Sequence, residues 1–294
     1  MNLYRLLSQR AADNKPLRVA LIGAGKFGTM FLAQARRTPG IHVVAVADLA
    51  PQRARDSLAR AGWHAERTRA GSLDEARRQG TTFVTDDAPA AIASDAVEIA
   101  IDATGSPAAG IRHALACCRH GKHIVMVNVE ADCLAGPLLA RRAREAGIVY
   151  SLAYGDQPAL ICELVDWARA AGFEVAAGGK GTQYLPAYHD STPETVWGHY
   201  GFSPEQVAGG DYNAQMFNSF LDGTKSAIEM AAVANATGLT PAPEGLSFPP
   251  CGVDDLPCVL KPAAEGGELH HRGQVEVVSS LERDGRPVAR DLRW

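Results

Sequence analysis

Three glycines, Gly23, Gly25 and Gly28, follow a short apolar run and have the G-x-G-x-x-G spacing of a turn that holds a pyrophosphate. The first glycine permits the tight bend, the second lets the backbone approach the phosphates, and the third lets the next helix pack on the strand. The pattern alone is weak, because a glycine turn without a ligand can carry it. A second apolar run, residues 42–47, ends in Asp48, 20 residues after Gly28, where a carboxylate can hydrogen-bond the adenosine ribose. Together these features predict a bound nicotinamide dinucleotide.

Polar side chains follow two further predicted strands, residues 97–102 and 123–127. Ligands of open parallel sheets lie outside the carboxyl ends of the strands, so we expect the loops after these strands to border the nicotinamide half and the substrate. A plain turn between strand and helix is the alternative for the first loop. The candidate cofactor-binding residues are Gly23, Gly25, Lys26, Phe27, Gly28, Asp48, Thr104, Gly105 and Asn128.

Glu130 follows the second of these strands and has two equally weighted interpretations. It borders the substrate, or it is the first-turn carboxylate of the next helix, where the helix dipole stabilises negative charge.

Two lysines are candidates for chemistry, because hydride delivery to a carbonyl builds negative charge on its oxygen and a preorganised cation stabilises that charge. Lys225 falls on the apolar face of a helix predicted over residues 213–236, with Asp222 and Glu229 spaced to pair with it. A lysine in a helix-surface ion pair is the alternative. Lys180 follows two glycines at the end of a strand predicted over 173–178, and a flexible surface lysine is its alternative. The candidate catalytic residues are Lys225, Asp222, Lys180 and Glu130.

The elements that must position these residues alternate between strand and helix up to about residue 152. The sequence therefore predicts an α/β fold, a Rossmann-type doubly wound parallel sheet over residues 1–153. A polar insertion at 62–80 has no readable role. Residues 154–294 are expected to form an α+β substrate and dimerisation region, with Asp156 capping its first helix and a final hairpin, 274–283 and 286–294, around Asp284-Gly285.

Composition narrows the class of protein. The chain has 294 residues, 46% hydrophobic and 21% charged, with a net charge of −4, which argues against a nucleic-acid partner. The arginines between residues 53 and 78 alternate with acidic residues, which favours solvated helix faces. No targeting segment or apolar run of membrane-spanning length is evident, so we expect a cytoplasmic protein that does not enter membranes. The six cysteines form no C-x-x-C pair and are expected to be buried free thiols.

The chain resembles the homoserine-dehydrogenase-like oxidoreductases that carry a C-terminal SAF domain, a group that includes the DXR-like (DRL) enzymes. The stretches that carry this resemblance are residues 23–28, 128–132, 154–169 and 220–239. DRL enzymes convert 1-deoxy-D-xylulose 5-phosphate to 2-C-methyl-D-erythritol 4-phosphate with NADPH, a step of isoprenoid biosynthesis. Members of the group continue past the point where this chain ends, so we expect a truncated or shortened relative.

Two departures from the family pattern affect the site. Homoserine dehydrogenases and ordinary reductoisomerases tend to have Asn-Lys after the fifth strand, whereas this chain has Asn128-Val129. Lys180 and Lys225 are the expected replacements for that lysine. Ordinary reductoisomerases place a metal-ligating carboxylate next, and Glu130 stands at the matching position, so a divalent metal is possible although no compact ligand cluster identifies its residues.

The sequence thus predicts an NAD(P)-dependent oxidoreductase, a homo-oligomer, acting on a small polar carbonyl or alcohol. The resemblance implies a DXR-like reductive isomerisation or a homoserine-dehydrogenase-like reaction. Asp48 favours NAD(H), because it would repel a 2′-phosphate, whereas the nearby Arg53 and the resemblance favour NADP(H). The alternative is a non-catalytic dinucleotide-binding sensor or assembly subunit, which needs no lysine or carboxylate aimed at the nicotinamide.

Overall fold

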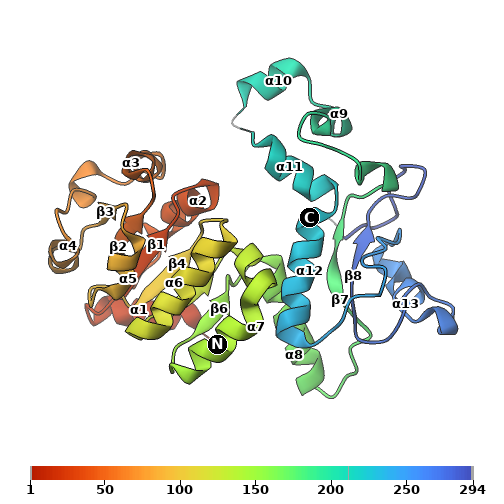
Figure 1. Ribbon diagram of the computed structural model, residues 1–294, viewed down its shortest axis with the longest axis horizontal. Helices are drawn as coiled ribbons and strands as arrows, with labels where there is room; N and C mark the ends of the chain where they lie inside the picture. The colour runs from red at the N-terminus through yellow and green to blue at the C-terminus, as the bar shows by residue number, and fades with distance from the viewer. Residues whose placement is uncertain (1, 211, 293–294) are drawn as a thin grey trace. The chain divides into compact units, whose positions relative to one another are not determined.

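The computed structural model describes residues 2–210 and 212–292. It divides the chain into two compact units, Met1–Ala153 and Tyr154–Trp294. The first unit contains a six-stranded parallel sheet in the order β3-β2-β1-β4-β5-β6 (Figure 1). Its strands are β1 Leu17–Ile22, β2 Ile41–Ala47, β3 Phe83–Thr85, β4 Ile99–Asp102, β5 His123–Met126 and β6 Tyr150–Leu152. The chain reverses direction across the sheet between β1 and β4, which is where open α/β sheets bind ligands.

Helices cover both faces of this sheet, as the continuous burial of β1, β2 and β4 requires. Its helices are α1 Leu3–Ala12, α2 Lys26–Ala35, α3 Pro51–Arg60, α4 Leu73–Gln79, α5 Ala88–Ala93, α6 Pro107–His120 and α7 Val129–Glu145. Leu32 of α2 packs in one hydrophobic cluster with Leu21 of β1. Cys117 of α6 and Leu139 of α7 pack in another with Ile124 of β5. The predicted Rossmann-type doubly wound sheet is therefore confirmed.

The polar insertion at 62–80 contains structure that the sequence analysis did not assign. It holds a 3-10 turn, Ala65–Arg67, and helix α4. The Ser72 side chain caps α4 by accepting a hydrogen bond from the backbone of Glu75, and Gly80 ends it in the left-handed conformation with φ +67°.

The second unit is built on a two-stranded parallel sheet of β7 Ala177–Thr182 and β8 Gln274–Ser279. Its helices are α8 Gln157–Ala170, α9 Val196–Tyr200, α10 Pro204–Gly209, α11 Ala214–Leu221, α12 Thr224–Thr237 and α13 Leu256–Val259, with 3-10 turns at Pro186–Tyr188, Val253–Asp255 and Ala263–Glu265. Ile161 of α8, Val233 of α12 and Val277 of β8 are buried in one core. Asp156 caps α8 as predicted, accepting from the backbone of Gln157.

The strand predicted over 173–178 is misplaced. The strand begins at Ala177, so the glycines and Lys180 lie inside β7 and not after it. Glycine is required there by close packing, because a Cβ on Gly179 would lie 1.7 Å from the Glu276 backbone oxygen and one on Gly178 would lie 2.6 Å from the Leu239 side chain.

The single helix predicted over 213–236 is also wrong. It is divided into α11 and α12 at Asp222 and Gly223, and Gly223 adopts φ +89°, which a continuing helix cannot contain. A single helical face therefore does not run from Leu221 to Lys225.

The final hairpin is much shorter than predicted, although the chain does turn back at Asp284-Gly285. β8 pairs in parallel with β7, and among the described residues the chain beyond it makes one antiparallel bridge, Leu281 with Pro287, around the Asp284-Gly285 turn. The end of the predicted second arm, residues 293–294, lies outside the described residues.

The six cysteines are free thiols, but only Cys117 and Cys251 are buried, and Cys258 is exposed. Within the described part of the chain, no helix is long and apolar enough to cross a membrane.

Candidate active site

The glycine turn between β1 and α2 has the shape of a cofactor cradle. Gly23 adopts φ +97°, and a Cβ there would lie 2.6 Å from the Ala103 backbone oxygen. A Cβ on Gly28 would lie 2.4 Å from the Gly23 oxygen. Apart from the neighbouring residues of the chain, the described residues leave open space within 4 Å of the Cβ position of Gly25, which is the N-cap of α2. Open space thus faces the helix amides, as a bound pyrophosphate requires.

The side chains after Gly25 belong to the first turn of α2. Lys26 is exposed, and the ring of Phe27 is partly exposed. Their contact with a cofactor stays a prediction.

Asp48 ties the end of β2 to the glycine turn. Its carboxylate accepts hydrogen bonds from the backbone N–H of Ala24 (2.9 Å) and Ala50 (2.9 Å). It also receives both Nε and Nη2 of Arg53, at 3.1 and 2.6 Å. Burial by itself disfavours the charged form, but these N–H groups and the guanidinium hold the Asp48 pKa below its ordinary value. Asp48 and Arg53, the two residues that the sequence led us to connect with cofactor preference, thus form one ion pair.

Thr104 and Asn128 converge on the buried Asp102 at the carboxyl ends of β4 and β5. Thr104 Oγ1 donates to Asp102 Oδ1 at 2.8 Å, and Asn128 Nδ2 lies 3.2 Å from the same oxygen. His113 Nδ1 of α6 lies 2.5 Å from Asp102 Oδ2. The sequence analysis placed Thr104 and Asn128 at this edge but missed His113. The only available signal was its position on the helix that follows Asp102. Gly105, in the same loop, adopts φ +65°.

Glu130 lies in the first turn of α7, which Asn128 caps by accepting from the backbone of Ala131. This position agrees with the helix-dipole interpretation, and a border with the substrate stays a prediction. Among the described residues, no three His, Cys, Asp or Glu side chains are grouped so that they could hold a metal ion.

The two candidate lysines line one pocket of about 410 Å³ in the second unit. Lys180 comes from β7 and Lys225 from the first turn of α12. The remaining lining residues are Gln157, Gly181, Thr182, Gln183, Phe220, Ser226 and Glu229.

The buried carboxylate of Glu229, which is only 4% exposed, joins the two lysines. Lys180 Nζ contacts Glu229 Oε2 and also donates to Gln157 Oε1 at 2.9 Å. Lys225 Nζ lies 3.8 Å from Glu229 Oε1. With side chains 14% and 24% exposed, neither lysine is a flexible surface residue. Two ammonium groups thus contact one carboxylate at the pocket wall.

Asp222 does not line this pocket. Its carboxylate accepts from the backbone of Thr224 at 2.8 Å and from Asn218 Nδ2 at 2.9 Å, at the break between α11 and α12. The sequence analysis offered both Asp222 and Glu229 as partners of Lys225, and the structure shows Glu229 in that place. The sequence did not reveal that Glu229 pairs with Lys180, 49 residues away, or that Gln157 accepts a hydrogen bond from Lys180.

Two family models match the chain, one in each unit. Residues 17–127 match the oxidoreductase family with an NAD-binding Rossmann fold, and residues 155–290 match the catalytic domain of oxidoreductase DRL. The second unit is thus similar to the DRL catalytic domain, and the first unit is similar to NAD-binding Rossmann domains of oxidoreductases. Among curated proteins, none matches the sequence.

Solved structures with a similar fold include three oxidoreductases. A homoserine dehydrogenase from Thiobacillus denitrificans is 15% identical with a TM-score of 0.47, covering 76% of this chain and 50% of that one. The 1-deoxy-D-xylulose 5-phosphate reductoisomerase from Zymomonas mobilis, in complex with NADPH, is 16% identical with a TM-score of 0.46, covering 76% and 59%. An NAD-binding oxidoreductase from Klebsiella pneumoniae is 19% identical with a TM-score of 0.40, covering 60% and 44%. The chain spans less than two thirds of the length of each.

Proposed function

We propose that this protein transfers a hydride between NAD(P) and a small polar carbonyl or alcohol, in a reaction of the DRL type. The observation that carries this proposal is the shared pocket of Lys180 and Lys225 over Glu229, which lies within the stretch that matches the DRL catalytic domain. The first substrate to test is 1-deoxy-D-xylulose 5-phosphate, and the second is homoserine. When bound in the glycine turn, the cofactor supplies the hydride.

The two lysines have different roles in this proposal. Lys180 is held by both Glu229 and Gln157, whereas Lys225 is the more exposed of the two. We therefore assign Lys225 to the substrate oxygen that gains negative charge, and Lys180 to a second positive charge that stabilises the same oxygen or a substrate phosphate. Asp222 acts as a positioning residue, because it holds the backbone at the start of α12 beside Lys225.

Cofactor contacts are assigned to the first unit. We propose that the pyrophosphate lies over Gly23 to Gly28, with Lys26 and Phe27 beside it. The nicotinamide half then borders Thr104, Gly105 and Asn128, and Glu130 borders the substrate. A divalent metal at Glu130 would be supported by activity that is lost on chelation and restored by Mg²⁺ or Mn²⁺.

The test is turnover of both substrates, with both cofactors, by the wild type, Lys180→Met and Lys225→Met. Lys261→Met is the matched control, because Lys261 lies in the same unit and does not line the pocket. We expect kcat to fall by about 10²-fold or more in both pocket variants, with cofactor affinity unchanged, and the control to retain activity.

Three outcomes would contradict the proposal or part of it. Cofactor binding without turnover of any carbonyl or alcohol by the wild type would favour the sensor alternative. Undiminished activity in a folded Lys225→Met variant would remove the catalytic role of that lysine. If Lys225→Met does not fold but Lys225→Gln folds with full activity, the ion pair with Glu229 is structural.

A further inference from the structure

The first unit has a second hollow, of about 950 Å³, on the opposite edge of the sheet from the glycine turn. Pro16, Arg18, His42 and Glu98 line it, and these residues lie at or just before the amino ends of β1, β2 and β4. The glycine turn follows the carboxyl end of β1, and a strand of 6 residues spans about 20 Å. The hollow is therefore separate from the cofactor cradle. We call it the basic pocket.

The wall of the basic pocket is strongly positive. Among its described lining residues, Glu98 is the one carboxylate. Its Oε2 accepts a hydrogen bond from the backbone N–H of Arg18 at 2.9 Å, and its Oε1 lies 3.5 Å from the Arg18 guanidinium. The cationic lining residues are Arg10, Lys15, Arg18, Arg36, Arg67, Arg77 and Arg78.

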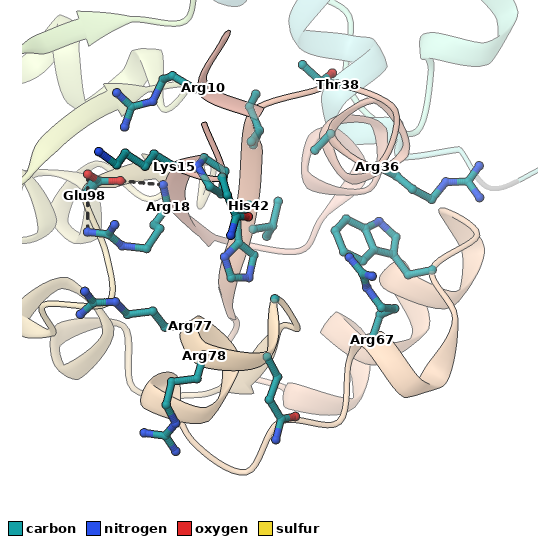
Figure 2. Close-up of a pocket in the computed structure, with 18 of the residues that line it drawn as sticks. Arg10, Lys15, Arg18, Arg36, Thr38, His42, Arg67, Arg77, Arg78 and Glu98 are labelled. Carbon is teal, nitrogen blue, oxygen red and sulfur yellow. Dashed lines mark hydrogen bonds and ion pairs between the residues drawn. The ribbon is translucent and has the colours of Figure 1, made fainter. Parts of the chain in front are cut away.

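Most of these cations gather at one end of the pocket. Figure 2 shows Arg10, Lys15, Arg18 and Arg77 on the side of His42 where Glu98 lies, with Arg67 on the other side. The buried Nε of Arg10 has no hydrogen-bond partner among the described residues. A single carboxylate does not balance this group, and the excess positive charge at the pocket favours the binding of an anion.

The insertion at 62–80 supplies three of the cations. Arg77 and Arg78 lie in the last turn of α4, whereas the acidic Asp74 and Glu75 lie in its first turn. Glu75 is turned toward its own loop, where Oε2 accepts the backbone N–H of Gly71 at 2.7 Å. The acidic residues of α4 thus lie at its start, and its arginines lie at its end, beside the pocket. Arg67, Arg77 and Arg78 are exposed, as predicted for solvated arginines, and they also line the basic pocket.

An aromatic side chain completes the wall. Trp63 lines the pocket, and its indole N–H donates to the backbone oxygen of Leu32 at 3.0 Å, which fixes the plane of the ring. His42 lies between the cations, with Nε2 2.7 Å from the Thr81 backbone oxygen. The pocket therefore combines a fixed flat ring with several guanidinium groups.

We propose that the basic pocket binds a small molecule that carries two or more phosphate groups. Guanidinium groups match phosphate oxygens in paired hydrogen bonds, and a volume of about 950 Å³ accommodates a ligand of nucleotide size. The site is concave and the chain carries a net charge of −4, which favours an enclosed small anion over a nucleic-acid strand. The inference does not depend on the proposed reaction.

The experiment is isothermal titration calorimetry of the full chain with inorganic pyrophosphate and with ADP, in the presence of saturating NAD(P)H. The cofactor occupies the glycine turn, so any binding that remains belongs to another site. Arg77→Gln/Arg78→Gln is the test variant, and Arg141→Gln/Arg142→Gln is its matched control. Each pair comprises adjacent exposed arginines near the end of a helix, and only the first pair lines the pocket.

We expect pyrophosphate to bind with one site per chain and with an affinity that falls as salt is added. The affinity should fall at least tenfold in the test variant and stay unchanged in the control. Tighter binding of ADP than of pyrophosphate would place a nucleoside against Trp63, and equal binding would restrict recognition to the phosphates. Either result supports the site.

The proposal is overturned if neither anion binds in the presence or absence of NAD(P)H, or if both double variants bind equally well. Lys15→Gln provides a second test, because Lys15 is exposed and lines the same end of the pocket. Loss of pyrophosphate affinity in Lys15→Gln, with an unchanged melting temperature, would separate a ligand contact from a folding defect.

Discussion

At the scale of single residues, Lys180 and Glu229 form an ion pair in the second unit with little exposure to solvent. Removing one partner of such a pair leaves an uncompensated charge in a poorly solvated place, whereas removing both does not. Glu229→Gln should therefore lower the free energy of unfolding by about 3 kcal/mol. The exposed Glu244, changed to Gln, is the matched control and should have little effect.

Urea unfolding measures the free energy of unfolding of the wild type, of Glu229→Gln, of Glu244→Gln and of the double variant Lys180→Met/Glu229→Gln. The double variant should be more stable than Glu229→Gln alone, because it no longer contains the Lys180 ammonium group that Glu229 balances in the wild type. If Glu229→Gln and Glu244→Gln are equally stable, the pair contributes nothing to folding.

The ion pair of Asp48 and Arg53 leads to a prediction about cofactor preference. Because Arg53 covers both carboxylate oxygens of Asp48, the carboxylate repels a 2′-phosphate less than an isolated one would. The Arg53 side chain is 58% exposed, so its guanidinium can also contact that phosphate. Arg53→Ala should weaken NADP(H) binding by about tenfold or more and change NAD(H) binding much less.

Fluorescence titration of both cofactors against the wild type, Arg53→Ala and Asp48→Ala checks this preference. Equal losses for the two cofactors in Arg53→Ala would mean that Arg53 acts only by holding Asp48. Unchanged NAD(H) affinity in Asp48→Ala would contradict the contact with the ribose.

The depressed pKa of Asp102 predicts how stability changes with pH. Burial opposes the charged form, but hydrogen bonds from His113 and Thr104 outweigh it and hold this pKa below its ordinary value of 3.8. Such a carboxylate adds stability above its unfolded-state pKa and loses that contribution as the pH falls through its folded-state pKa. The stability margin of the wild type over Asp102→Asn should therefore be full near neutral pH and shrink below about pH 4. Urea unfolding across this range measures the margin, and a constant margin would contradict the assignment.

At the scale of elements, Gly179 determines whether β7 and β8 can pair. A Cβ there would overlap the Glu276 backbone, which cannot move without breaking the ladder that places Lys180. Gly179→Ala should cost more than about 2 kcal/mol in unfolding free energy, or prevent folding of the second unit. Gly198→Ala, in helix α9 with open space around its Cβ position, is the matched control and should be neutral. Equal melting temperatures for the two variants would contradict this packing.

Most elements of the first unit could be predicted because their apolar residues recur in a regular pattern, whereas α4, which buries only Ala76, was missed. The second unit lacks this regularity. β7 consists of Ala, Gly, Lys and Thr, so the apolar run just before it was taken for the strand. Gly223 ends a helix inside a segment whose side chains favour helix on both sides, and only its left-handed backbone shows the break.

At the scale of the whole molecule, the sequence predicted the parts of the candidate site better than their connections. Strand ends bring Thr104 and Asn128 together, which follows from the parallel sheet. The bond from Lys180 to Glu229 joins β7 to α12 and depends on tertiary packing that no local pattern encodes. The basic pocket could not be predicted for the same reason, because its cations come from α1, β1, the end of α2 and the insertion, which are separate in the sequence.

The expected cofactor site and the lysine pocket lie in different units of the chain. The glycine turn and Asp48 lie in the first unit, and the lysine pocket lies entirely in the second. A ligand that binds only folded protein stabilises it by about 2.7 kcal/mol at a concentration 100 times its dissociation constant. Calorimetric unfolding of the full chain should therefore show two transitions, of which saturating NAD(P)H raises one. Glu229→Gln should lower the other, and the cofactor should still raise its own transition in that variant. If the cofactor and Glu229→Gln both move a single transition, the two units unfold as one, and the cofactor's stabilisation extends to the lysine pocket.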